Sequence, residues 1–249
     1  MGGASAVLDR LGAERVAALL ALAAVLGTYY SVSESLRNLS VWWEVVVLGL
    51  LVIPAVFALV YCVLPLWRAR GLLAVGLAVA VLAAALEVGE LDVLANFAKL
   101  AAVTLLAFWF LSWFETAAWV VIVALIVPWV DAISVWRGPT KHIVTEQPEL
   151  FTTFSFAFPL PGERHTAQLG LPDLLFFALF LAATVRFGLR TRLTWAAMAL
   201  SFGATLALAV AFDINGLPAL PLLAAGFLLP NADLLWRELR AQGAWGRRT

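Results

Sequence analysis

The chain has 249 residues, of which 63% are hydrophobic and 13% are charged, and its formal net charge is zero. Soluble domains carry about 45–50% apolar and about 25% charged residues, so this composition excludes an ordinary soluble fold and predicts a membrane protein. The neutral charge gives no indication of a nucleic-acid partner. The one cysteine, Cys62, excludes an internal disulfide and a cysteine-based metal cluster.

Apolar stretches that approach the length of a membrane span, about 20 residues, follow one another along the chain. Only the connection Arg137–Gln168 is long and partly polar. We therefore expect an all-α fold, a polytopic transmembrane bundle of about eight or nine helices. It forms one membrane domain, residues 1–249, with N-terminal helices in 1–114, further helices in 115–236 and an extramembrane loop at 137–168. The expected spans are Val16–Tyr30, Trp42–Trp67, Leu72–Leu86, Phe97–Phe114, Thr116–Trp136, Leu169–Phe187, Thr194–Phe212 and Leu217–Trp236.

Arginine and lysine are distributed unevenly between the two membrane faces that eight spans define. Basic residues concentrate in the cytoplasmic loops of membrane proteins. We therefore expect the arginine-rich face and the C-terminus to be cytoplasmic, and the long loop to lie outside. The arginine-rich face carries Arg10, Arg15, Arg68, Arg70, Arg186, Arg190, Arg192, Arg237, Arg240, Arg247 and Arg248, and the other face carries Arg37, Lys99, Arg137, Lys141 and Arg164.

Two carboxylates interrupt the apolar stretches on either side of the long loop. Asp131 lies close before the end of one expected helix, and Asp173 lies close after the start of the next. At a rise of about 1.5 Å per residue, both lie about 6–9 Å below the same membrane face. Two carboxylates at matched depth on adjacent helices can meet and share a proton, as in aspartic proteases, where the pair activates water. The alternative is that each aspartate separately caps a helix or lines a polar contact.

The last expected helix opens with Pro218-Ala219-Leu220-Pro221, on the same membrane face as the aspartates. Pro221 removes a backbone donor in the first turn and Pro218 fixes φ, so this helix begins irregularly. Irregular backbone at membrane depth is tolerated where it is buried in protein or lines a wet cavity. An ordinary proline-rich helix start is the alternative.

Taken together, these motifs resemble those of the presenilin and signal peptide peptidase family of intramembrane aspartyl proteases, especially its small prokaryotic members. The segment around Val130-Asp131, with Thr140-Lys141-His142 after it, looks like the family's Tyr-Asp segment and the basic stretch that follows. Gly170-Leu171-Pro172-Asp173 is similar to the Gly-x-Gly-Asp motif, and Pro218-Ala219-Leu220 matches the Pro-Ala-Leu motif. The resemblance covers roughly residues 115–236. Three features depart from the family pattern: Val130 stands in place of tyrosine, Pro172 stands in place of the second glycine, and the chain has about eight expected spans where the family has nine.

The resemblance implies a presenilin-like bundle in a prokaryotic plasma membrane. It implies an endopeptidase that cleaves transmembrane segments or signal peptides with water activated by Asp131 and Asp173, and that needs no metal or other cofactor. Arg164–Leu171 reads as an extended segment, and by resemblance it can add a strand to an unwound substrate. An inactive homologue that binds transmembrane segments and a proton-coupled transporter remain as alternatives. The substrate-binding residues implied are Gly170, Leu171, Pro172, Pro218, Ala219, Leu220 and Pro221.

Overall fold

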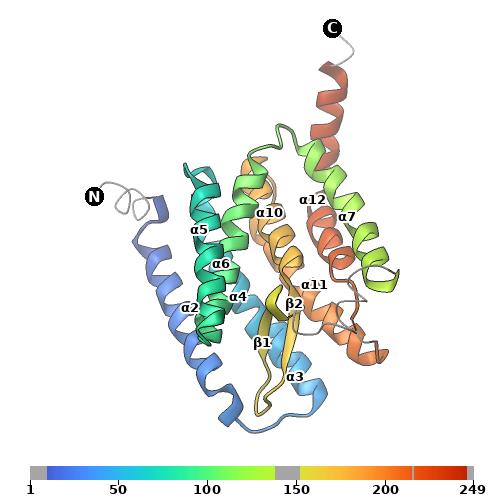
Figure 1. Cartoon of the computed structure of the whole chain (residues 1–249). Helices are drawn as coiled ribbons and strands as arrows, with labels where there is room; N and C mark the ends of the chain where they lie inside the picture. Colours follow the sequence, from blue (N-terminus) through green and yellow to red (C-terminus); the bar gives the residue numbers. More distant parts are fainter. Residues whose placement is uncertain (1–9, 138–151, 215, 246–249) are drawn as a thin grey trace, which may run out of the picture.

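A computed structural model describes residues 10–137, 152–214 and 216–245 (Figure 1). The basic segment Thr140-Lys141-His142 and about half of the long loop lie outside the described residues. The described part is mainly helical, with one two-stranded hairpin. Its elements are α2 (Ala13–Val32), α3 (Val41–Val47), a π-helical turn (Leu48–Val52), α4 (Ile53–Val63), a 3₁₀ turn (Leu64–Arg68), α5 (Leu72–Val88), α6 (Asp92–Leu111), α7 (Ala117–Arg137), β1 (Ser155–Pro159), β2 (Thr166–Gly170), α10 (Leu171–Arg186), α11 (Thr191–Ala211) and α12 (Leu220–Trp245).

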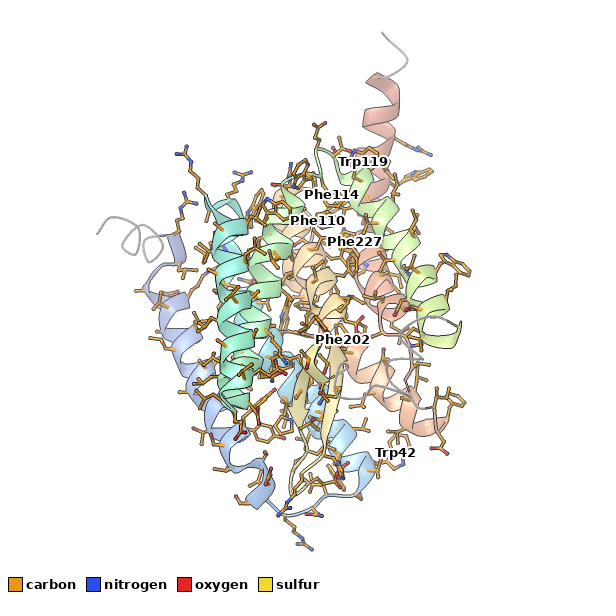
Figure 2. All side chains as sticks on the ribbon, in the orientation of Figure 1. Trp42, Phe110, Phe114, Trp119, Phe202 and Phe227 are labelled. Carbon is orange, nitrogen blue, oxygen red and sulfur yellow. The ribbon has the colours of Figure 1, made fainter. Side chains whose placement is uncertain are left out.

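Five of the described helical stretches are long and apolar enough to cross a membrane. Large aromatic side chains mark both ends of the bundle, since Figure 2 shows Trp42 near one end and Trp119 and Phe114 near the other. Aromatic residues gather at both membrane–water interfaces. With the composition, these helices indicate an integral membrane protein, as predicted. The five stretches are Ala13–Ser35, Val41–Arg68, Asp92–Leu111, Ala117–Val135 and Thr191–Ala211.

Helix α10 lies at the centre of the bundle, between α6 on one side and α11 and α12 on the other. Every residue from 177 to 184 is fully buried, as expected for a helix that is apolar all round. The ring of Phe177 stacks on Phe57 at 3.9 Å, and the ring of Phe180 stacks on Phe227 at 4.8 Å. The 16 residues of α10 span about 24 Å, less than the hydrocarbon core of about 30 Å, and β2 leads directly into this helix.

The β1–β2 hairpin is the part of the fold that the all-α expectation omitted. The strands pair antiparallel, with Ser155 opposite Gly170 and Pro159 opposite Thr166. Phe156 and Phe158 are buried, and the Phe156 ring contacts the rings of residues on α2 and α6. Residues predicted to lie in an extramembrane loop thus pack against the helices. The extended reading of the segment before Asp173 agrees with β2.

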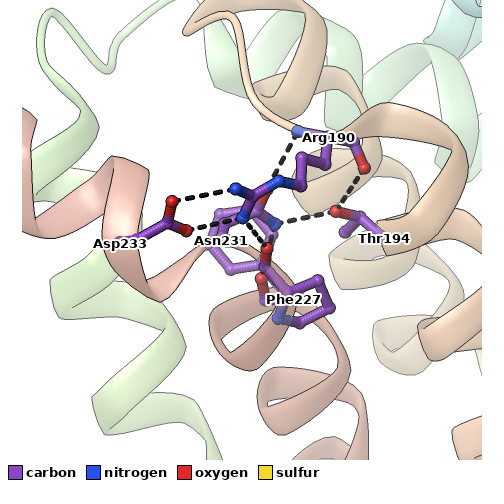
Figure 3. A network of polar contacts seen from close by, with 6 residues as sticks. Arg190, Thr194, Phe227, Asn231 and Asp233 are labelled. Carbon is purple, nitrogen blue, oxygen red and sulfur yellow. Dashed lines mark hydrogen bonds and ion pairs between the residues drawn. The ribbon is translucent and has the colours of Figure 1, made fainter.

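A network of hydrogen bonds joins the α10–α11 connection to α12 (Figure 3). The backbone N–H of Arg190 donates to Oδ1 of Asn231, which is fully buried and donates in turn to Thr194 Oγ1. The Arg190 guanidinium bonds the Pro230 carbonyl and both carboxylate oxygens of Asp233. These contacts lie around Pro230, and α12 continues through the proline as one helix.

Candidate active site

Asp131 lies in α7, six residues before the end of that helix, and its side chain is half-buried. Its Oδ2 accepts a hydrogen bond of 3.1 Å from the backbone N–H of Leu220. Leu220 is the first residue of α12, where the N–H group has no acceptor within the helix. The carboxylate of Asp131 therefore lies at the positive end of the α12 dipole, which favours a negative charge.

Asp173 is the third residue of α10, and its side chain turns back toward the start of the helix. The backbone of Gly170, the residue that caps α10, hydrogen-bonds the Asp173 carboxylate. This is the return arm of a capping box, with aspartate in the acidic position. A β-carbon on Gly170 would lie 3.2 Å from Asp173 Oδ2, so a side chain at residue 170 would crowd the carboxylate.

The two aspartates lie on helices that contact each other, α7 and α10, and both of these helices contact α12. The charge of Asp131 acts on the carboxylate of Asp173, which places the two groups within electrostatic range. Both aspartates are half-buried. Each carboxylate accepts a hydrogen bond from one backbone amide at a helix start, and each has a second oxygen. The arrangement brings two acids, each held by one backbone amide, to the junction of three helices.

The predicted substrate-binding residues occupy different positions around this junction. Pro218, Ala219 and Leu220 are buried, and of these Leu220 contacts Asp131 through its backbone. Pro172 is exposed in the first turn of α10, where its missing N–H leaves no broken helical bond. The N–H of Leu171 continues the hairpin ladder by donating to the Phe154 carbonyl. Pro221 is half-buried in the first turn of α12.

Three polar residues that the sequence analysis did not single out hold β1 in place. Asn96, buried on α6, donates from Nδ2 to the Ala157 carbonyl at 2.8 Å and accepts from the Ala157 N–H at 2.9 Å. The hydroxyl of Tyr30 donates to the same carbonyl, and the hydroxyl of Tyr29 donates to the Pro159 carbonyl. An asparagine within an apolar span is a signal that could have identified this anchor.

The outer edge of β2 is free among the described residues. Because Ala157 directs its N–H and carbonyl to Asn96, the pair Ala157–Gln168 is not hydrogen-bonded across the hairpin. Gln168 therefore turns its own N–H and carbonyl away from β1, and no described backbone group bonds them there. Thr166 has the same orientation, two residues away. This edge leads into Gly170 and Asp173, so an extended chain paired with β2 would run toward the two carboxylates.

Within the described part of the chain, no three histidine, cysteine, aspartate or glutamate side chains lie close enough to hold a metal ion. The groups available for chemistry where α7, α10 and α12 come together are two carboxylates and two backbone amides, in apolar surroundings. No protein-family model matches the sequence, and a search of the curated proteins finds no match. The interpretation of the site therefore depends on its geometry and on the motifs in the sequence.

Proposed function

We propose that the protein is an intramembrane aspartyl endopeptidase of the presenilin and signal peptide peptidase type. The observation that supports this is that Asp131, bonded to the first amide of α12, lies close enough to Asp173 for their charges to interact. Two carboxylates in a site of low dielectric constant disfavour the doubly ionised state, so the pair retains one proton. The protonated carboxylate can then act as the general acid and the ionised carboxylate as the general base. Peptide hydrolysis by water requires both.

In the proposed reaction, a water molecule lies between the carboxylates. The ionised aspartate accepts a proton from this water as the water oxygen bonds to the carbonyl carbon of the substrate. The protonated aspartate donates to the carbonyl oxygen, which gives a tetrahedral diol. Transfer of a proton to the amide nitrogen then breaks the C–N bond and leaves a carboxylic acid and an amine. The backbone amides of Leu220 and Gly170 orient the two carboxylates, because each holds one carboxylate oxygen.

The substrates of the proposed enzyme are transmembrane segments of membrane proteins or signal peptides. A helical segment hides its peptide groups in intrahelical hydrogen bonds, so it must unwind before water can reach them. The free edge of β2, at Thr166 and Gln168, offers backbone partners for the unwound segment. Gly170, Leu171 and Pro172 connect this edge to Asp173, and Pro218, Ala219, Leu220 and Pro221 form the wall beside Asp131.

The test replaces each aspartate by asparagine, which keeps an oxygen for the backbone amide and removes the acid. We expect Asp131→Asn and Asp173→Asn each to lower cleavage of a transmembrane peptide in liposomes by about 100-fold or more. Asp213→Asn is the matched control, because Asp213 is an exposed turn residue with a φ of 51° that asparagine also tolerates. Wild-type cleavage rates in either of the first two variants would exclude the pair as the catalytic group.

A second candidate function is a non-catalytic protein that binds transmembrane segments. It is favoured by the capping geometry, because both carboxylates already stabilise the start of a helix. Such a cap contributes about 0.5–2 kcal/mol. If the caps are the whole role of the two residues, wild type does not cleave, and alanine at either position lowers the unfolding temperature while asparagine does not. A proton-coupled transporter is the third candidate, and proton flux measured in liposomes distinguishes it from both.

We also propose that the arginine-rich end of the bundle is cytoplasmic and that the protein resides in a prokaryotic plasma membrane. Arg68 ends the 3₁₀ turn after α4, Arg186 ends α10, and Arg190 lies in the connection to α11. Arg68 and Arg186 line the same pocket. A cytoplasmic C-terminus corresponds to the orientation of signal peptide peptidases and favours substrates with a cytoplasmic N-terminus. A C-terminal reporter enzyme that works only outside the cytoplasm would contradict this orientation.

A further inference from the structure

A pocket of about 700 Å³ lies at the end of the bundle away from the aspartates. It is lined by the turn between α4 and α5 and by the ends of α6 and α10, with Trp67, Arg68, Trp109, Ser112 and Arg186 among its residues. Its volume falls in the range of about 300–1,000 Å³ that is typical of small-molecule sites. Arg186 is 13 residues after Asp173 along α10, which corresponds to about 20 Å, so the pocket is separate from the candidate active site.

Two arginines share this pocket without a carboxylate between them. The guanidinium carbons of Arg68 and Arg186 lie 4.4 Å and 5.9 Å from the centre of the Trp67 ring. The two positive charges repel each other, and Glu115 acts on Arg186 only through its field. Neither arginine forms an ion pair with a described carboxylate. An anion that bridges the two guanidinium groups would relieve this repulsion.

The structure fixes one arginine and leaves the other able to adjust. Arg186 is half-buried and donates to the Leu111 carbonyl at the end of α6, so part of its guanidinium is held. Arg68 is exposed, on the turn that leads to α5. Ser112 adds a hydroxyl at the rim, and Trp67 and Trp109 add apolar rings. The site thus combines a fixed cation, an adjustable cation and rings that can contact an acyl chain.

We infer that this pocket binds the phosphodiester headgroup of an anionic phospholipid. Arginine binds phosphate oxygens through two parallel hydrogen bonds, and basic pockets between transmembrane helices are typical sites for anionic headgroups. Tryptophan side chains lie at the headgroup level of a bilayer, so the depth of the pocket suits a lipid. The bound lipid joins the α4–α5 turn to the ends of α6 and α10, and α10 is the helix that carries Asp173.

The experiment measures thermal unfolding of the purified full chain in detergent micelles that contain increasing phosphatidylglycerol or phosphatidylcholine. We expect phosphatidylglycerol to raise the unfolding temperature and phosphatidylcholine to leave it unchanged, because a ligand of the folded state stabilises it. Arg68→Gln should require about five-fold more phosphatidylglycerol for half of the effect, which corresponds to about 1 kcal/mol for one basic side chain. Arg70→Gln removes the same charge from an exposed residue of the same turn outside the pocket, and should respond as wild type does.

A second variant and a second ligand distinguish a lipid site in the pocket from a free-anion site. Arg186→Lys keeps a donor for the Leu111 carbonyl and loses the forked guanidinium, so it should also weaken the response to phosphatidylglycerol. Inorganic phosphate at the same concentrations should give no stabilisation, since it lacks the acyl chains. Equal responses of Arg68→Gln and Arg70→Gln would mean a diffuse surface effect and would overturn the pocket as the lipid site. Equal stabilisation by inorganic phosphate would assign the site to a free anion and overturn the lipid proposal.

Discussion

The bond between Asn96 and Ala157 gives the sharpest quantitative prediction, and the perturbation is Asn96→Leu. Leucine has a similar volume and makes no hydrogen bonds, so the variant removes both contacts to Ala157. The Ala157 carbonyl keeps the Tyr30 hydroxyl, while the Ala157 N–H loses its acceptor. A buried N–H without a partner costs about 1–3 kcal/mol. We therefore expect the free energy of opening the hairpin to fall by about 2 kcal/mol, or about 30-fold in the opening equilibrium.

Hydrogen exchange followed by mass spectrometry measures this opening directly, on peptides that cover residues 155–159. Tyr30→Phe is the control, because the Ala157 carbonyl then still has Asn96 as a donor. It should lose about 0.5–1.5 kcal/mol, the contribution of one ordinary hydrogen bond. The double variant leaves the carbonyl without a partner as well, so its effect should exceed the sum of the single effects. Unchanged exchange in Asn96→Leu would refute the anchor and leave packing of Phe156 as what holds the hairpin.

Three other substitutions test separate parts of the structure. Gly203→Ala should lower the unfolding temperature, because the added β-carbon would lie 3.0 Å from the Gly49 Cα. Overpacking of this kind costs about 1–3 kcal/mol. The control Gly27→Ala should leave the unfolding temperature unchanged, because residue 27 has open space around it. Asn231→Leu should cost about 1–3 kcal/mol in denaturant unfolding, because it removes the acceptor of a backbone N–H in the α10–α11 connection. Pro172→Gly should fold normally and change the cleavage rate of a transmembrane peptide only modestly.

The helical part of the fold could be predicted because one physical rule governs it. Helices that face lipid must be apolar over about 20 residues, and the expected span Trp42–Trp67 differs from the helical stretch Val41–Arg68 by one residue at each end. The last helix was predicted to end at Trp236 and continues to Trp245, because hydropathy does not report where a helix ends beyond the membrane.

The hairpin and its anchors could be predicted only in part. Extended residues before Asp173 were expected, but strand pairing depends on a register between residues 155–159 and 166–170 that no local pattern specifies. Asn96 acts on Ala157, 61 positions away, so its role follows only from the tertiary arrangement. For the candidate site, matched depth indicated that Asp131 and Asp173 can meet. The bond between Asp131 and the Leu220 amide joins α7 to α12 across 89 positions and has no signature in either segment.

Pro172 connects the geometry of the hairpin to the position of Asp173. Proline fixes its own φ and restricts the residue before it, so the chain between β2 and α10 has few alternative conformations. Since residue 172 is exposed in the first turn of α10, the ring is accommodated without loss of a helical hydrogen bond. The proline thus limits how far Asp173 can move relative to Gly170, whose amide already holds its carboxylate. If wild type is inert and Pro172→Gly gains cleavage that depends on Asp131, this restriction holds Asp173 away from the productive geometry, and the protein is a protease that has lost its activity.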